Sequence, residues 1–172
     1  MSAPPRVAVL TVSDRSFRGE REDRGGPAVA DAARRLLGAE VVEARVVPDE
    51  KDDIAWNIAR YADNEHVDLV LTTGGTGLTL RDVTPEATRS VVAFEVPGLT
   101  EAMRAASRAA LPSAMLSRQV AGVRGKTLVL NLPGSPRGAV ECLEAVASAL
   151  PHAVAILRGE APDAHPARTD LA

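Results

Sequence analysis

The sequence predicts an α/β protein, a three-layer αβα sandwich with a mostly parallel central sheet. Short apolar segments rich in Val and Leu alternate along the chain with segments whose apolar residues recur at helical spacing. The short segments are continuously apolar, which is typical of parallel strands covered by helices on both faces. The chain has 172 residues, 45% hydrophobic but only 2% aromatic. We therefore expect one domain with a core of Ala, Val and Leu.

The first half of the chain supplies three predicted strands. Each is a short apolar run that ends at polar residues, and they cover residues 6–12, 41–47 and 67–72. Between the first two, Pro27 suits the first turn of a helix whose apolar face continues to Gly38. Between the second and third, a helix is expected after Asp49.

The second half continues the alternation. Thr84-Pro85-Glu86 has the composition of a helix start: a hydroxyl cap, a proline in the first turn and a carboxylate beside it. Another helix is expected at residues 99–110 and another strand at residues 127–132. A long helix then continues to Arg158, and Pro151 kinks or restarts it.

Composition excludes several classes of protein. The net charge is −3 and aromatics are scarce, which argues against nucleic-acid binding, because that requires a basic face or stacking side chains. The single cysteine, Cys142, rules out a disulfide within the chain and favours the cytoplasm. No targeting or membrane-spanning segment is expected. We assign residues 1–159 to the domain and predict a flexible tail at residues 160–172, which are rich in Ala, Pro and charge.

Four of the predicted strands end in polar or glycine-rich loops. Because the carboxyl ends of parallel strands lie on one edge of a sheet, these loops should meet at a ligand site. The loops are Ser13-Asp14, Asp49, Thr72–Asp82 and Asn131–Ser135.

The loop after the third strand predicts a phosphate site. Gly74, Gly75 and Gly77 allow positive φ and close approach of a ligand to the backbone, and consecutive N–H groups in such a turn attract an anion. Neighbouring threonines, Thr73 and Thr76 among them, add hydroxyl groups. The sequence lacks a Walker loop and a dinucleotide-binding motif, so the site must depend on backbone amides, hydroxyls and arginines such as Arg81. The alternative is a tight strand-to-helix turn without a ligand.

Asp49 and Asp82 predict a cation at this edge. Two carboxylates beside bound phosphates repel them unless a cation intervenes, and Mg²⁺ is the expected one. Each aspartate also has a simpler explanation: Asp49 as a helix N-cap, and Asp82 as the partner of a local arginine. The Asn131–Pro136 segment is open to a similar choice between a second ligand-binding turn and a well-capped helix.

Several sequence blocks together resemble the molybdenum cofactor biosynthesis family of MogA and MoaB type. The blocks are VSDR, VPDE, TTGGTG with RDVTPEAT, EVPGLTEAMR and AMLSRQVAGVRGKTLVLNLPGSP. They extend over about residues 6–158. The resemblance implies that the protein binds molybdopterin and transfers AMP to its phosphate from ATP, with Mg²⁺. It also implies a homotrimer that passes the product to a molybdate-inserting enzyme.

The resemblance also implies functional residues. Asp49 and Asp82 match the family's two important aspartates, and thus become the catalytic and metal-binding candidates. Together with the strand-end argument, the substrate-binding candidates are Ser13, Asp14, Thr73, Gly74, Gly75, Thr76, Gly77, Arg81, Ser107, Ser117, Asn131, Pro133, Gly134 and Ser135.

Some features depart from the family's pattern or leave it open. The first loop often has the sequence D-x-S-G in the family, whereas here it is Asp23-Arg24-Gly25-Gly26, without the serine. That loop is rich in arginine, and a solvated charged loop is the simpler explanation for Arg18 and Arg21. A pterin-binding module of MoaB type without catalysis is the alternative function, and a nucleotide-processing domain of CinA type shares the fold.

Overall fold

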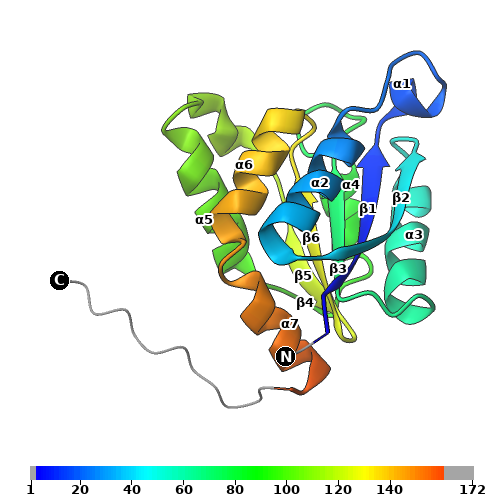
Figure 1. Cartoon of the computed structure of the whole chain (residues 1–172). Helices are drawn as coiled ribbons and strands as arrows, with labels where there is room; N and C mark the ends of the chain where they lie inside the picture. The colour runs from blue at the N-terminus through cyan, green and yellow to red at the C-terminus, as the bar shows by residue number, and fades with distance from the viewer. Residues whose placement is uncertain (1–2, 161–172) are drawn as a thin grey trace.

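A six-stranded sheet organises the chain, whose computed structural model describes residues 3–160. The strand order is β2-β1-β3-β6-β5-β4 (Figure 1). The parallel part consists of β1 (Arg6–Val12), β2 (Glu40–Val47), β3 (Leu69–Thr73) and β6 (Thr127–Leu132). The other two strands, β5 (Ala121–Arg124) and β4 (Phe94–Glu95), are antiparallel to their neighbours. The predicted mostly parallel sheet is confirmed.

Helices cover both faces of the sheet, as predicted (Figure 1). One face is covered by α2 (Gly25–Leu37), α5 (Pro97–Arg108), α6 (Pro136–Val146) and α7 (Leu150–Arg158). The other is covered by α3 (Lys51–Asp63) and α4 (Thr84–Arg89). Two short elements complete the chain: α1 (Asp14–Phe17) and the 3₁₀ helix η1 (Pro112–Leu116).

Alternate residues of each central strand enter the two core layers. In β1, Val7 and Val9 pack with α2 and α6, whereas Ala8 and Leu10 pack with α3. Both layers consist mainly of Ala, Val, Leu and Ile, and Tyr61 is the one aromatic side chain in them. Burial on both faces explains why the strands are continuously apolar in sequence.

The boundaries of some elements differ from the predicted ones. The third strand begins at Leu69 rather than Val67, and the helix predicted at 99–110 spans Pro97–Arg108. The sequence did not reveal β4 and β5, which have two and four residues and pair antiparallel at the sheet edge. The long C-terminal helix divides into α6 and α7 with a bend of 66°. Pro151 lies in the first turn of α7, so its predicted restart of the helix is confirmed.

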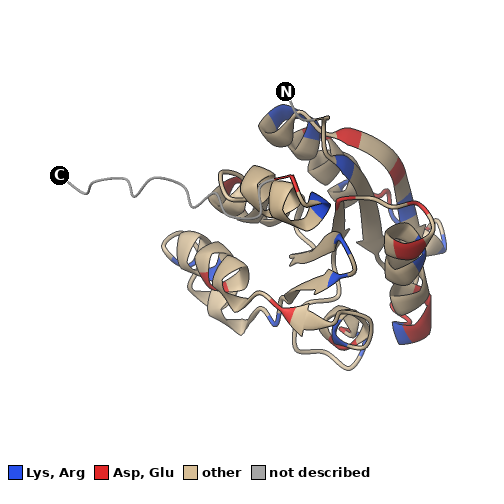
Figure 2. Cartoon of the chain, turned by 90° about the horizontal axis from the view of Figure 1, so that it is seen from below, with Lys and Arg blue, Asp and Glu red and all other residues tan. Residues whose placement is uncertain are grey.

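No single helix within residues 3–160 is long and apolar enough to cross a membrane. The bent pair α6–α7 reaches that length and composition only when its two helices are taken together, and both pack against the core. Acidic and basic residues are both scattered over the helices and loops around the sheet in the view from below (Figure 2). Apart from Glu160, the predicted tail lies outside the described residues.

Candidate active site at the carboxyl edge of the sheet

The four parallel strands end almost level with one another. Val12 is paired with Val47, Thr11 with Thr73, and Thr73 with Leu132. The loops that follow these strands therefore converge on one edge, as the sequence predicted. The site is built from these loops.

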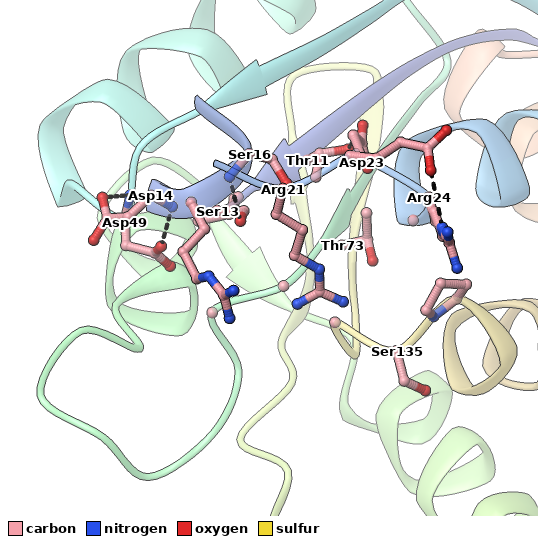
Figure 3. A pocket seen from close by; sticks show the side chains of 18 of the residues that line it. Thr11, Ser13, Asp14, Ser16, Arg21, Asp23, Arg24, Asp49, Thr73 and Ser135 are labelled. Carbon is pink, nitrogen blue, oxygen red and sulfur yellow. Dashed lines mark hydrogen bonds and ion pairs between the residues drawn. The ribbon is translucent and has the colours of Figure 1, made fainter. Parts of the chain in front are cut away.

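Asp14 and Asp49 join the ends of β1 and β2. The Asp14 N–H donates to Asp49 Oδ2 at 2.7 Å, and the Asp49 N–H donates to Asp14 Oδ1 at 3.0 Å (Figure 3). The N-cap of α3 is Glu50, and the Asp49 carboxylate binds the β1 loop instead. The simpler explanation of Asp49 as a helix N-cap is therefore wrong.

Arg81 ties the glycine-rich loop to this pair. Its guanidinium donates to both carboxylate oxygens of Asp14, at 3.0 and 3.1 Å, and to Glu50 at 2.8 Å. Arg81 thus neutralises Asp14 and does not line either cavity described below.

The turn after β3 requires glycine at its first two positions. Gly74 has φ +105° and Gly75 has φ +65°. A Cβ on Gly74 would lie 2.3 Å from the carbonyl oxygen of Val12, which no side chain can occupy. The glycines therefore serve close packing against β1 as well as the predicted backbone freedom.

Hydrogen bonds from Thr84 fix the conformation of this turn. Thr84 donates from Oγ1 to the Gly74 carbonyl at 2.9 Å and from its N–H to the Gly75 carbonyl at 3.1 Å. Thr84 lies inside α4, so it is a brace of the turn rather than the predicted cap. The N–H groups of Gly75 and Thr76 donate to no other described residue. Two consecutive free amides can therefore bind an anion such as phosphate.

Arg118 braces the same turn from the other side. It donates to the carbonyls of Gly77 at 2.8 Å and Asp82 at 2.5 Å, and it pairs with Glu86. Nothing in the residue pattern singled out Arg118 as part of the site. Its place directly after Ser117, in a block shared with the family, was the available signal.

Asp82 closes the loop with its carboxylate, whereas Arg118 contacts only its backbone carbonyl. Its Oδ2 accepts from the N–H of Thr79 at 2.8 Å and from the Thr79 hydroxyl at 2.7 Å. The described residues form no ion pair to its carboxylate, so the simpler explanation of Asp82 as an arginine partner is wrong. Both predicted aspartates flank the turn: Asp49 Oδ1 lies 3.3 Å from an ideal Cβ on Gly75, and Asp82 Oδ2 lies 2.9 Å from one on Gly77.

The ionisation of the two aspartates differs. Burial raises the pKa of Asp49, and the carboxylates of Asp14 and Asp82 raise it further, against the hydrogen bond from Asp14 and the charge of Arg81. Burial also acts to raise the pKa of Asp82, but hydrogen bonds from Thr79 and from the Gly77 backbone outweigh it and hold that pKa below its usual value. A cation near both would relieve the repulsion at Asp49.

These aspartates fit a Mg²⁺ site of the kind that substrates complete. Within residues 3–160 no group of three or more His, Cys, Asp or Glu side chains is placed to hold a metal. Mg²⁺ is usually held by one or two carboxylates, with phosphate oxygens and waters as its other ligands. Asp49 and Asp82 would supply the two carboxylates of such a site, and its other ligands would have to come from substrate phosphates and water.

A polar cleft of about 590 Å³ opens over the ends of β1, β2 and β3 (Figure 3). We call it the polar cleft. The predicted residues that line it are Ser13, Asp14, Asp49, Thr73, Gly74, Gly75, Gly134 and Ser135. Its remaining wall comes from the arginine-rich segment between β1 and α2. Asp23 anchors that segment by accepting from the Thr11 hydroxyl at 2.8 Å and from the Gly26 N–H at 2.9 Å.

A second cavity of about 370 Å³ lies between this edge and the α5–η1 segment. We call it the apolar cavity, because Leu78, Leu111 and Leu116 contribute to its walls. Gln119 and Cys142, which the sequence did not single out for this role, also line it. The predicted residues that line it are Thr76, Gly77, Ser107, Ser117, Pro133 and Ser135.

A ridge formed by Gly74–Gly77 and Pro133–Ser135 contributes to both spaces. The Thr73 hydroxyl donates to the Pro133 carbonyl at 2.8 Å, and the Gly74 N–H donates to the Leu132 carbonyl at 3.2 Å. Ser135 caps α6 by accepting from the Gly138 N–H at 3.0 Å, so the capped-helix explanation holds while the residue also lines both spaces.

Asn131 lies beneath the ridge rather than in either space. It is fully buried, accepts from the Val120 N–H, and donates to the hydroxyls of Thr72 and Thr88. All of its hydrogen-bonding groups are used within the core. The structure therefore corrects the predicted role of Asn131 from a ligand contact to a support for the strand ends.

Comparison with known proteins assigns the family. Residues 8–152 match the family described as a probable molybdopterin binding domain. The chain belongs to this family. It is 44% identical over 154 residues to a protein of Helicobacter pylori strain J99 named molybdopterin adenylyltransferase, covering 89% of this chain and 88% of that one.

Solved structures agree with this assignment. The crystal structure of the molybdopterin biosynthesis enzyme MoaB from Thermus thermophilus has 53% identity and a TM-score of 0.84, covering 90% of this chain and 97% of that one. The CinA protein of Thermoplasma acidophilum has 19% identity and a TM-score of 0.63, covering 85% and 98%. The CinA likeness therefore shows a shared fold alone.

Proposed function

We propose that this chain is a molybdopterin adenylyltransferase of molybdenum cofactor biosynthesis, which transfers AMP from ATP to the phosphate of molybdopterin. The observation that carries the proposal is the pair of unlike spaces beside one phosphate-binding ridge. Transfer of AMP from a polyphosphate to the phosphate of a pterin needs a polar site for the first substrate and an apolar site for the heterocycle of the second. The two sites must meet at the reacting phosphates. The names of the relatives support the same reaction.

In this proposal the polar cleft holds the nucleotide and the apolar cavity holds the pterin. Ser107, Ser117 and Thr76 orient the pterin side. The free amides of Gly75 and Thr76 bind a phosphate at the ridge. Asp49 and Asp82 hold Mg²⁺, which when bound neutralises charge on the nucleotide phosphates.

The reaction needs positioning more than proton transfer. An oxygen of the molybdopterin phosphate attacks the α-phosphorus of ATP, the bond from that phosphorus to the bridging oxygen breaks, and pyrophosphate leaves with the electron pair. The attacking phosphate is already ionised near neutral pH, so no general base is required. The residues of the ridge hold the two phosphates in line.

The test is product formation. Purified protein is incubated with molybdopterin and Mg-ATP, and adenylyl-molybdopterin and pyrophosphate are quantified. Binding of molybdopterin without either product would favour the alternative, a pterin-binding module of MoaB type. A homotrimer, a cytoplasmic location and hand-off to a molybdate-inserting enzyme remain predictions of the proposal, and mass measurement in solution tests the first.

A further inference from the structure

Four arginines line the outer wall of the polar cleft, and they fall into two classes. Arg18 pairs with Glu20 and Arg24 pairs with Glu22, each at 3.0 Å. The side chains of Arg15 and Arg21 form no ion pair or hydrogen bond with any of residues 3–160. Figure 3 shows the Arg21 side chain pointing into the cleft.

The carboxylates of the cleft are already occupied. Arg81 neutralises Asp14, Arg24 pairs with Glu22, and Asp23 accepts two hydrogen bonds from neighbouring residues. Asp49 stands apart at the end of β2, tied to the Asp14 N–H. The outer wall therefore carries two guanidinium groups with no anionic partner among the described residues.

The segment that bears these arginines is ordered by its own backbone. The N–H groups of Arg18, Gly19 and Glu20 donate to the carbonyls of Asp14, Ser16 and Arg15, at 2.9 to 3.1 Å. Asp23 fixes the other end of the segment at Thr11 and Gly26. Because these hydrogen bonds fix the backbone of the segment, its arginines are held near the cleft before a ligand binds, and this lowers the entropy cost of binding.

We propose that Arg15 and Arg21 form a clamp for the β- and γ-phosphates of the nucleotide, and hence for the pyrophosphate leaving group. The proposal rests on the proposed adenylyl transfer. Guanidinium groups bind phosphate oxygens in pairs of hydrogen bonds. The ridge offers only neutral amides and hydroxyls, and the chain's two lysines, Lys51 and Lys126, line neither space. As the bond to the α-phosphorus breaks, negative charge grows on the pyrophosphate, which the clamp stabilises.

Inorganic pyrophosphate is the direct probe. Calorimetric titration should give a pyrophosphate affinity for the wild-type protein that falls on the order of 10- to 100-fold in Arg15→Gln and Arg21→Gln. The matched controls are Arg34→Gln and Arg137→Gln, which remove an exposed arginine that lines neither space and already has a carboxylate partner. AMP affinity should not change in any of the four variants, because AMP lacks the two outer phosphates.

The kinetic arm separates this inference from the proposed function. In Arg15→Gln and Arg21→Gln, kcat/KM for ATP should fall by a similar factor while KM for molybdopterin is unchanged. Equal pyrophosphate affinity in wild type, Arg15→Gln and Arg21→Gln would overturn the clamp, as would an equal loss in the controls or no binding by wild type. Absence of adenylyl-molybdopterin from the wild-type assay would instead overturn the proposed function, and the pyrophosphate titration would still test the clamp.

Discussion

The polar cleft and the apolar cavity share a ridge but differ in how their walls are made. The cleft is bounded by strand-end loops and the arginine-rich segment, and its lining is charged, with ion pairs at Arg24 and Asp14 and two arginines, Arg15 and Arg21, that pair with no described residue. The cavity is bounded by α5, η1 and the start of α6, and its leucines surround several hydroxyls, the Gln119 amide and two charged side chains, Arg104 and Glu141. The difference shows that one edge of a sheet can offer both a polar and an apolar binding space. The segment between β1 and α2 lines the first, and α5 with η1 lines the second.

Substitution of Asp82, which lies beside Gly77 of the ridge but lines neither space, should cause the largest loss. We expect Asp82→Asn to lower turnover on the order of 10²- to 10³-fold, because the charge that holds Mg²⁺ is removed. The amide oxygen can still accept from Thr79. Steady-state assays with molybdopterin and Mg-ATP measure the effect. The control is Asp63→Asn, at the C-terminal end of α3, which should leave turnover unchanged. Near-normal turnover in Asp82→Asn would reject the metal role.

A substitution in the ridge should weaken binding in the polar cleft and in the apolar cavity alike, because the ridge borders both. Gly74→Ala places a Cβ against the Val12 carbonyl at a φ of +105°, so we expect a loss of about 3 kcal/mol in unfolding free energy. Affinity for both substrates should fall together. Gly38 has φ +61° and no atom near its ideal Cβ, so Gly38→Ala measures the effect of the left-handed backbone alone. It should lower the unfolding free energy by about 1–2 kcal/mol. Denaturant unfolding and binding titrations measure both, and equal losses in the two variants would contradict the packing argument.

A change in the apolar cavity should affect the pterin alone. Ser117 Oγ is buried and forms no hydrogen bond with another described residue. We expect Ser117→Ala to raise KM for molybdopterin about tenfold and to leave KM for ATP unchanged, because a hydroxyl that bonds the ligand is lost. Stability should not fall, since no hydrogen bond within the described chain is broken. Ser148→Ala, exposed between α6 and α7, is the control; a parallel rise in KM for ATP would show that the two spaces are not separate.

The sequence predicted which loops meet at the edge of the sheet better than it predicted which residues support and line the site there. The sequence runs predicted to end at Val12, Val47, Thr72 and Leu132 contain the information that the loops converge, because parallel strands share one orientation. The braces of the ridge were not predictable in this way. Arg118 reaches Gly77 across 41 residues, and Asn131 reaches Thr88 across 43, and no periodicity relates such pairs. Asn131 also shows that a residue in a family block can support a site without lining it.

The smallest predicted effect concerns the ionisation of Asp49 in protein without substrate or metal. Its pKa is raised by burial and by two neighbouring carboxylates, so the charged form is less favourable in the folded chain than in the unfolded chain. In the pH range between the unfolded and folded pKa values the folded state binds more protons, and stability contributed by this group falls as pH rises. Asp49→Asn removes the charge and keeps an acceptor for the Asp14 N–H. We therefore expect a slightly higher melting temperature for Asp49→Asn than for wild type at neutral pH.

Low pH should abolish this difference in stability between wild type and Asp49→Asn, and the cation should reverse it. Below the ordinary aspartate range Asp49 is protonated in both folded and unfolded wild type, so the advantage of Asp49→Asn should disappear there. Saturating Mg²⁺ with ATP should stabilise wild type more than the variant, because only wild type retains both carboxylates. Melting temperatures recorded across pH with and without Mg-ATP test both statements. A variant that gained as much from Mg-ATP as wild type would show that Asp49 takes no part in holding the ion, and the cation would then have to be assigned to the other flank of the ridge.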